Sequence, residues 1–287
     1  MTLQATKEET LIISVAQQIK NGDKLLLGIG LPITAGAIAK NTHAPDAILM
    51  MESGMVDFKP LINPMHVADA CSCKGYSYAI DLFSMFTTVT HRGFIDKAIL
   101  GVGQIDKFGN VNSSFKGDDP TSDRPITGAG GAPEFISYAR ETILTLKGGE
   151  FVEKLPYFTS PGYFNGGDER DNKGYYPKGS GPKVLISPHG LFKFDSISKE
   201  MYLDALFPGV TLDEVKALIP WDLKIADPLN KYPIPTEAEI LALRQFNPGS
   251  AFTKPVATEL SMANMQRKIM ERQAQLNQCK TAAPSAN

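Results

Sequence analysis

Apolar and polar residues recur along the chain with two different periods, and each period predicts one kind of element. A capping box at Thr6 precedes residues 11–19, where the apolar positions follow the spacing of a helix. Residues 25–28 and 47–51 are short apolar runs, which are typical of strands buried on both faces. Residues 33–40, which lie between them, predict a second helix. This order of strand, helix and strand predicts a parallel sheet.

The same two periods recur through the rest of the chain. They predict buried strands over 97–103, 142–146 and 184–187, turns into return strands over 106–112 and 188–194, and helices opened by capping boxes at Thr211 and Thr236. Residues 161–182 are rich in Gly, Asn, Asp and Tyr, and we interpret them as a long ordered loop with functional potential. The sequence contains no evident internal repeat or linker, so it predicts one α/β domain.

Composition and charge limit the classes of function. Of the 287 residues, 43% are hydrophobic, which is ample for a large core. The formal net charge of −2 provides no basic excess that would favour nucleic acid as a partner. No apolar run reaches the roughly 18 residues of a transmembrane helix, and residues 1–10 are polar, unlike a secretory signal. We therefore expect a cytoplasmic protein that does not enter a membrane.

The three cysteines predict neither a disulfide framework nor a metal site. Their number is odd, and Cys71 and Cys73 are separated by one residue, whereas Cys279 lies in the tail. With His66 the pair could supply three metal ligands, but the C-x-C spacing differs from that of zinc sites. We expect no metal, and we expect Cys71 and Cys73 to be buried or half-buried thiols.

Glu52 is the first candidate for chemistry, because it follows a predicted buried strand at once. Ser53 and Gly54 then make a sharp turn. In open α/β sheets, ligands bind at the carboxyl ends of strands. A charge at that place costs free energy unless it is paired or used. From these residues alone, a structural role in which Glu52 caps a loop stays open.

The glycine-rich stretch 127–132 is the second candidate. Gly128, Gly130 and Gly131 allow backbone amides to approach a ligand closely, and a helix is predicted to begin just after them. Such amides can stabilise an oxyanion. A plain flexible turn is the alternative.

Together, the two candidates suit one kind of chemistry. The sequence has no Ser-His-Asp spacing, and its four histidines are scattered. A lone nucleophilic carboxylate beside an oxyanion hole fits acyl transfer through an anhydride.

Several short motifs of the sequence, taken together, resemble those of a known family. Five blocks, in this order, resemble the β subunits of glutaconate-type class I CoA-transferases: Glu52-Ser53-Gly54, Gly103-Gln104-Ile105-Asp106, Gly109-Asn110-Val111-Asn112-Ser113, Thr127-Gly128-Ala129-Gly130-Gly131-Ala132 and Thr159-Ser160-Pro161-Gly162. The resemblance spans roughly residues 8–253. It implies a CoA-transferase domain over 1–255, and it leaves 256–287 as an extension with a helix at 259–278 and a disordered end.

The resemblance implies an open α/β fold, with a mostly parallel sheet flanked by helices, like that of the sugar-phosphate isomerase and deaminase group. It implies an α subunit as obligate partner, an active site between the two subunits, and ping-pong transfer of coenzyme A through an enzyme–CoA thioester. Glu52 matches the catalytic glutamate, and Gly128, Gly130 and Gly131 match the glycine loop. By analogy, the amide of Gly130 or Gly131 contributes to the oxyanion hole. No tightly bound cofactor or metal is implied.

The sequence leaves two other functions open. Many relatives have Glu-Asn-Gly where this chain has Glu52-Ser53-Gly54, which indicates the glutaconate-type branch. Some relatives have lost the glutamate and act as decarboxylases or hydrolases, whereas this chain retains it. The alternatives are a CoA-ester hydrolase on the same fold and a non-catalytic CoA-binding subunit.

Overall fold

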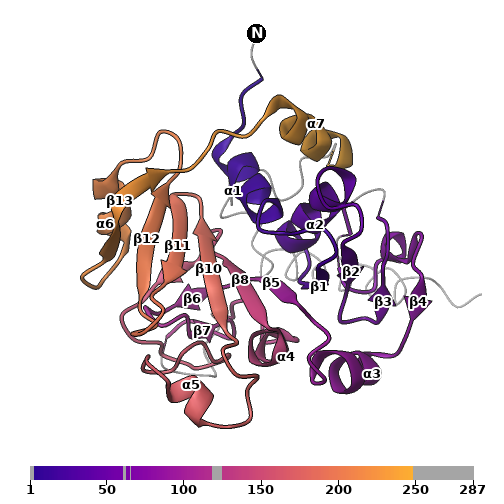
Figure 1. The fold of residues 1–287 in the computed structure, drawn as a ribbon, viewed down its shortest axis with the longest axis horizontal. Coiled ribbons are helices and arrows are strands. Elements are labelled where there is room, and N and C mark those ends of the chain that lie inside the picture. The colour runs from indigo at the N-terminus through magenta and orange to yellow at the C-terminus, as the bar shows by residue number, and fades with distance from the viewer. Residues whose placement is uncertain (1–2, 61–62, 65, 118–124, 248–287) are drawn as a thin grey trace, which may run out of the picture. The chain divides into compact units, whose positions relative to one another are not determined.

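A computed structural model describes residues 3–60, 63–64, 66–117 and 125–247 (Figure 1). The chain divides into two compact units, Met1–Thr253 and Lys254–Asn287, and the second lies outside the described residues. The predicted extension 256–287, with its helix at 259–278, therefore also lies outside them.

Within the described residues, the main sheet has ten strands. From one edge to the other they are β13 (Lys224–Lys231), β12 (Met201–Leu206), β11 (Gly190–Phe194), β10 (Pro182–Ser187), β8 (Glu141–Thr145), β5 (Lys97–Gly101), β1 (Lys24–Leu27), β2 (Ile48–Met50), β3 (Met55–Val56) and β4 (Tyr78–Ala79). The central strands β2, β1, β5, β8 and β10 run parallel to one another. Beyond them, β3, β4, β11 and β12 pair antiparallel, and β13 is parallel to β12. The predicted open and mostly parallel sheet is confirmed.

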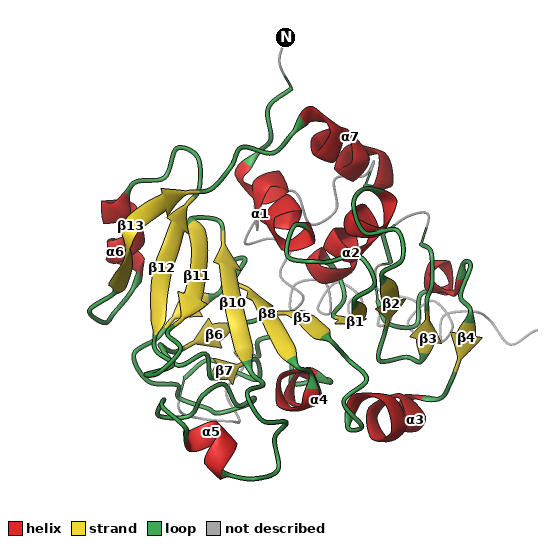
Figure 2. Ribbon diagram, in the orientation of Figure 1, coloured by secondary structure: helices red, strands yellow, loops and turns green. Residues whose placement is uncertain are grey.

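Helices lie on both sides of this sheet (Figure 2). Helices α1 (Lys7–Ala16), α2 (Leu31–Asn41) and α7 (Glu237–Phe246) pack on one another, and α4 (Ala132–Tyr138) packs on β5 and β8. The remaining elements are the helices η1 (Ala70–Cys73), α3 (Leu82–Ser84), η2 (Met85–Thr90), α5 (Glu169–Asn172) and α6 (Leu212–Leu218), and a small sheet of β7 (Val111–Asn112), β6 (Gln104–Ile105) and β9 (Glu150–Phe151).

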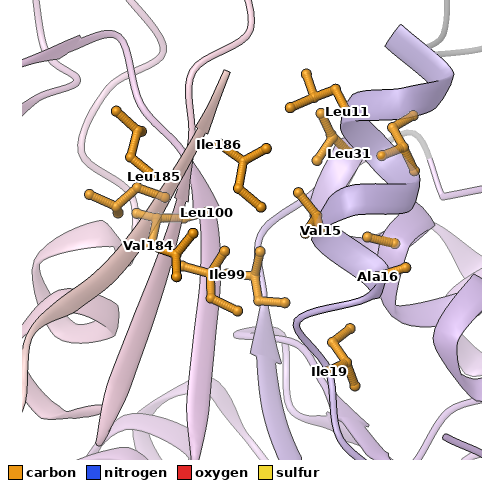
Figure 3. Packing of buried hydrophobic residues seen from close by; sticks show 14 of the residues in the cluster. Leu11, Val15, Ala16, Ile19, Leu31, Ile99, Leu100, Val184, Leu185 and Ile186 are labelled. Carbon is orange, nitrogen blue, oxygen red and sulfur yellow. The ribbon is translucent and has the colours of Figure 1, made fainter. Parts of the chain in front are cut away.

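The core lies between α1 and the central strands. Leu11 and Val15 of α1 are fully buried near Ile99 of β5 and Ile186 of β10 (Figure 3). Burial of one such side chain contributes about 1.5–3 kcal/mol. Because the central strands are buried on both faces, the site is built on a rigid base.

Local sequence signals identify most of these elements. The capping boxes at Thr6, Thr211 and Thr236 are all present. The strands that were not predicted include β3, β4 and β9, which have two residues each, and the longer β12 and β13. For these two longer strands the sequence holds different signals. Strand β12 alternates buried and half-buried residues, which is a usable signal. Strand β13 contains Pro228, which argues against a strand except at a sheet edge, and β13 lies at the edge.

Cys71 and Cys73 lie in η1, and both are free thiols. Cys71 is half-buried, as predicted, and burial raises the pKa of its thiol to about 11. The prediction is wrong for Cys73, which is exposed. The short helix η1 buries Ser72 and turns Cys73 outward.

Candidate active site

Glu52 lies in the tight connection between β2 and β3, which form an antiparallel pair. Gly54 closes this turn, since its N–H donates to Met51 O at 3.0 Å and its φ is +97°. A Cβ at Gly54 would collide with the carbonyl oxygen of Ile80. Only glycine fits there, and the turn fixes Glu52 at the carboxyl end of β2.

The glycine loop has one end tied to a neighbouring segment and the other end at a helix. The N–H of Gly128 donates to Ser113 O at 2.8 Å. Gly128 and Gly130 have φ values of +85° and +50°, which favour glycine. Helix α4 begins directly after Gly131, its N-cap, as the sequence predicted.

The structure brings Glu52 and Gly131 together. A Cβ at Gly131 would meet Oε2 of Glu52, and it would lie 2.8 Å from Cζ of Phe86 and 3.2 Å from Cε2 of Phe135. Gly131 is buried, so its backbone forms one wall of the carboxylate site. Gly128 and Gly130 are not in such contact, because a Cβ at either would meet no described atom within 4 Å.

The electrostatic environment of Glu52 favours its neutral form. Burial of the half-buried carboxyl raises its pKa, and the nearby Glu134 carboxylate raises it further. A backbone hydrogen bond from Gly131 lowers the pKa but does not outweigh burial. Glu52 forms no ion pair with any described residue. Such a poorly solvated carboxylate is a candidate nucleophile.

Several polar groups around the loop have no partner. Among the described residues, none accepts a hydrogen bond from the amides of Ala129 and Gly130. The hydroxyls of Ser53 and Ser113 are buried, and they too lack a partner in the described part of the chain. Because buried polar groups are usually satisfied, the two hydroxyls indicate a place that a polar ligand completes. The amide of Gly130 is exposed, so it is accessible to such a ligand.

The long loop 161–182 is ordered around Arg170, which is 1% exposed. Its guanidinium donates to the carbonyls of Pro161 and Gly162 in the loop. It also donates to the carbonyls of Ile136 and Ser137, at the C-terminal end of α4, at 2.7 and 3.0 Å. The loop is thus attached to the end of α4 that lies away from Gly131.

Sequence reasoning does not single out Phe86, Glu134 or Arg170. Phe86 belongs to η2, a π-helix without a regular apolar period. The sequence places Glu134 only in a predicted helix and Arg170 only in a polar loop. Their roles depend on contacts between distant segments, which no local pattern reveals.

The described ranges contain neither a metal-binding cluster nor a membrane span. Within them, His, Cys, Asp and Glu side chains form no group of three or more that could hold a metal ion. No helix there is long and apolar enough to cross a membrane.

Comparison with known proteins identifies the family of the chain. Residues 8–218 match the family described as Coenzyme A transferase. Over 238 residues, the chain is 34% identical to the β subunit of 3-oxoadipate CoA-transferase from Pseudomonas knackmussii, with 82% of this chain and 91% of that protein covered. The chain belongs to the coenzyme A transferase family.

Two further matches concern one CoA-transferase. The β subunit of glutaconate CoA-transferase from Acidaminococcus fermentans is 33% identical over 261 residues, covering 88% of this chain and 97% of that protein. The crystal structure of glutaconate CoA-transferase from this organism matches with a TM-score of 0.81 at 31% identity, covering 88% of this chain and 99% of that chain. The resemblance stated from the sequence is confirmed, and so is the prediction of a transferase.

Proposed function

We propose that this chain is the β subunit of a CoA-transferase that moves CoA between an acyl-CoA and a carboxylic acid, with Glu52 as nucleophile. One observation carries the proposal. The Glu52 carboxylate lies against Gly131 in a poorly hydrated place without an ion-pair partner in the described residues. A structural carboxylate would be saturated with hydrogen bonds or paired with a cation.

The proposed cycle has two half-reactions. Glu52 attacks the thioester carbon of an acyl-CoA, the C–S bond breaks, and CoA leaves as a thiolate. The product is a mixed anhydride of Glu52 and the acyl group. The thiolate then attacks the glutamyl carbon and releases the acid, which leaves CoA on Glu52 as a thioester. An acceptor carboxylate reverses these steps, and CoA is the only carrier that they require.

The amide of Gly130 is the proposed oxyanion donor from this chain. It has no acceptor among the described residues, whereas the Gly128 amide is bonded to Ser113 and the Gly131 amide faces Glu52. One such donor contributes about 3–4 kcal/mol to transition-state stabilisation in comparable sites. Gly128, with its φ of +85°, holds the loop in the shape that exposes this amide.

A partner α subunit completes the proposed enzyme, because two relatives are each named as one subunit of a CoA-transferase. Large apolar side chains are exposed near the Glu52 turn, on β4, α3 and the segment after η2. They are Tyr78 at 63%, Leu82 at 54%, Phe83 at 73% and Phe94 at 57% exposure. Exposed apolar patches are typical of interaction sites. We propose that the partner covers this face and that the complex works in the cytoplasm.

The proposed acid substrate is a dicarboxylate. The two relatives are named for 3-oxoadipate and glutaconate, and both acids carry two carboxylates. The alternatives are a hydrolase, which would use water as acceptor, and a CoA-binding subunit without catalysis.

An acceptor-dependence assay tests the proposal. The chain is co-expressed with its partner subunit and given succinyl-CoA or acetyl-CoA, with and without glutaconate or 3-oxoadipate. A transferase forms new acyl-CoA only with an acceptor. Equal loss of the donor without any acceptor would indicate a hydrolase, and no turnover of the complex would favour the binding subunit.

A further inference from the structure

Phe86 lies at the Glu52 site and has no role in the proposed reaction cycle. Its ring touches the same face of Gly131 as the Glu52 carboxylate, so a Cβ added there would meet both. Phe135 also borders Gly131, but it is 3% exposed and belongs to the core. Phe86 is half-buried, with part of the ring packed on the core and part outside it.

The π-helix η2 holds Phe86 in this place. Its wider turn is visible in the bond from His91 N–H to Phe86 O at 2.8 Å, five residues apart. Met85 and Thr90 at its two ends are fully buried, and the hydroxyl of Thr90 donates to Met85 O. Beyond η2, the ring of His91 lies 4.0 Å from that of Tyr138 in α4. The Phe86 ring is therefore fixed from both sides against the helix that begins at Gly131.

An apolar ring fixed beside a reactive carboxyl group excludes water from it. If Glu52 carries CoA, water is the competitor of the acceptor acid. In that side reaction, water attacks the glutamyl carbon and the C–S bond breaks. The products are CoA thiol, the Glu52 carboxylate and one proton. Transfer instead needs an acceptor carboxylate at the same carbon.

We propose that Phe86 shields the glutamyl-CoA thioester from water and thereby sets the ratio of hydrolysis to transfer. This inference rests on the proposed role of Glu52. Phe86 makes no bond to the reacting atoms, and it acts by filling the space beside Glu52. The loop 161–182, for which the sequence indicated functional potential, is attached to the opposite end of α4.

A graded series tests the proposal: Phe86→Leu, Phe86→Val and Phe86→Ala, each in the co-expressed complex. Succinyl-CoA is supplied without acceptor, and released thiol gives the hydrolysis rate. New acyl-CoA formed with glutaconate or 3-oxoadipate gives the transfer rate. We expect the ratio of hydrolysis to transfer to rise as the side chain shrinks, by about tenfold for Ala, which corresponds to about 1.4 kcal/mol between the two barriers. The isolated enzyme–CoA thioester should decay faster in the same order.

Tyr175→Ala is the matched control, because Tyr175 is an aromatic residue that is 62% exposed and packs on Tyr176. It should leave the ratio unchanged. If the Ala variant does not fold, the Leu and Val variants retain apolar packing and carry the test. An unchanged ratio and thioester half-life in the folded variants would overturn the inference alone. Failure of the wild-type complex to form any CoA adduct would instead overturn the role of Glu52.

Discussion

One charged residue lies at each end of α4, and the two differ in how far hydrogen bonds compensate for their burial. At the C-terminal end, Arg170 is almost fully buried and forms no ion pair within the described residues. Its guanidinium donates to four backbone carbonyls and to the hydroxyl of Ser180, and it lies 4.3 Å from the ring of Tyr176. At the N-terminal end, Glu52 is also without an ion pair in the described part of the chain, but it has only the Gly131 backbone as a close polar partner there.

This difference separates a structural charge from a reactive one. Arg170 has its donors satisfied, so its burial costs little and removing it leaves carbonyls unpaired. The Glu52 carboxylate can accept further hydrogen bonds and its pKa is raised, and both features are typical of a reactive group. Burial alone does not distinguish the two, whereas hydrogen bonding does.

Replacement of the nucleophile should have the largest effect. We expect Glu52→Gln to lower the transfer rate by more than about a thousandfold, because an amide cannot form the anhydride. The matched control is Glu153→Gln, at an exposed carboxylate, which should retain the wild-type rate. The assay is acyl-CoA exchange by the co-expressed complex. Near wild-type turnover of Glu52→Gln would contradict the assignment of Glu52 as the reactive residue.

Crowding the site should have the next largest effect. A side chain in Gly131→Val would push aside both the Glu52 carboxylate and the Phe86 ring. We expect turnover to fall by about a hundredfold, similar to the loss of one oxyanion donor. Gly22→Ala is a control for backbone strain without crowding, since Gly22 has a φ of +83° and open space around it. It should lose some stability and retain its turnover. Equal rates for Gly131→Val and wild type, in complexes of equal stability, would argue against this site.

Replacement of Arg170, the structural charge, should lower stability and leave turnover nearly unchanged. We expect Arg170→Met to lower the free energy of unfolding by about 3 kcal/mol, because several buried carbonyls lose their donor. Turnover per folded complex should be nearly unchanged. Arg140→Met, at a surface residue 3.7 Å from Asp96, should change stability by less than about 0.5 kcal/mol. Denaturant titration measures both. A loss of turnover without loss of stability in Arg170→Met would contradict the distinction.

The smallest effect concerns pH. Because the pKa of Glu52 is raised above its ordinary 4.5, its ionised form is lost at a higher pH than usual as the solution is acidified. Transfer by the wild type should therefore fall on acidification before an ordinary glutamate would protonate. Glu134→Gln removes one cause of the shift, so its activity profile should extend to lower pH. The pH dependence of kcat/KM for both enzymes checks this, and coincident profiles would contradict it.

The same raised pKa predicts a stability effect of definite sign. The folded protein binds the Glu52 proton more tightly than the unfolded chain does. Stability should therefore fall as the pH rises from 4.5 through the raised pKa, and the cost persists above it. Glu52→Gln removes this cost. Denaturant titration at neutral pH should find the variant at least as stable as the wild type.

The sequence predicted the backbone elements that position Glu52, but it did not predict which residues surround the carboxylate. The strand that ends at Glu52, the turn at Gly54 and the helix after Gly131 are all local patterns, and each was predicted. The three glycines of the loop look alike in the sequence, yet only Gly131 contacts Glu52. Phe86 and Arg170 reach α4 from distant segments, and those contacts are set by tertiary packing rather than by local period.

Peptide mapping of the trapped intermediate tests the central claim most directly. The complex is incubated with succinyl-CoA and then treated with borohydride, which reduces a glutamyl thioester to the alcohol. We predict that mass spectrometry will locate this change at Glu52, only when acyl-CoA and borohydride are both present, and equally in Arg170→Met. Absence of the change at Glu52 in an active complex, or modification at Cys71 or Cys73 instead, would contradict the account.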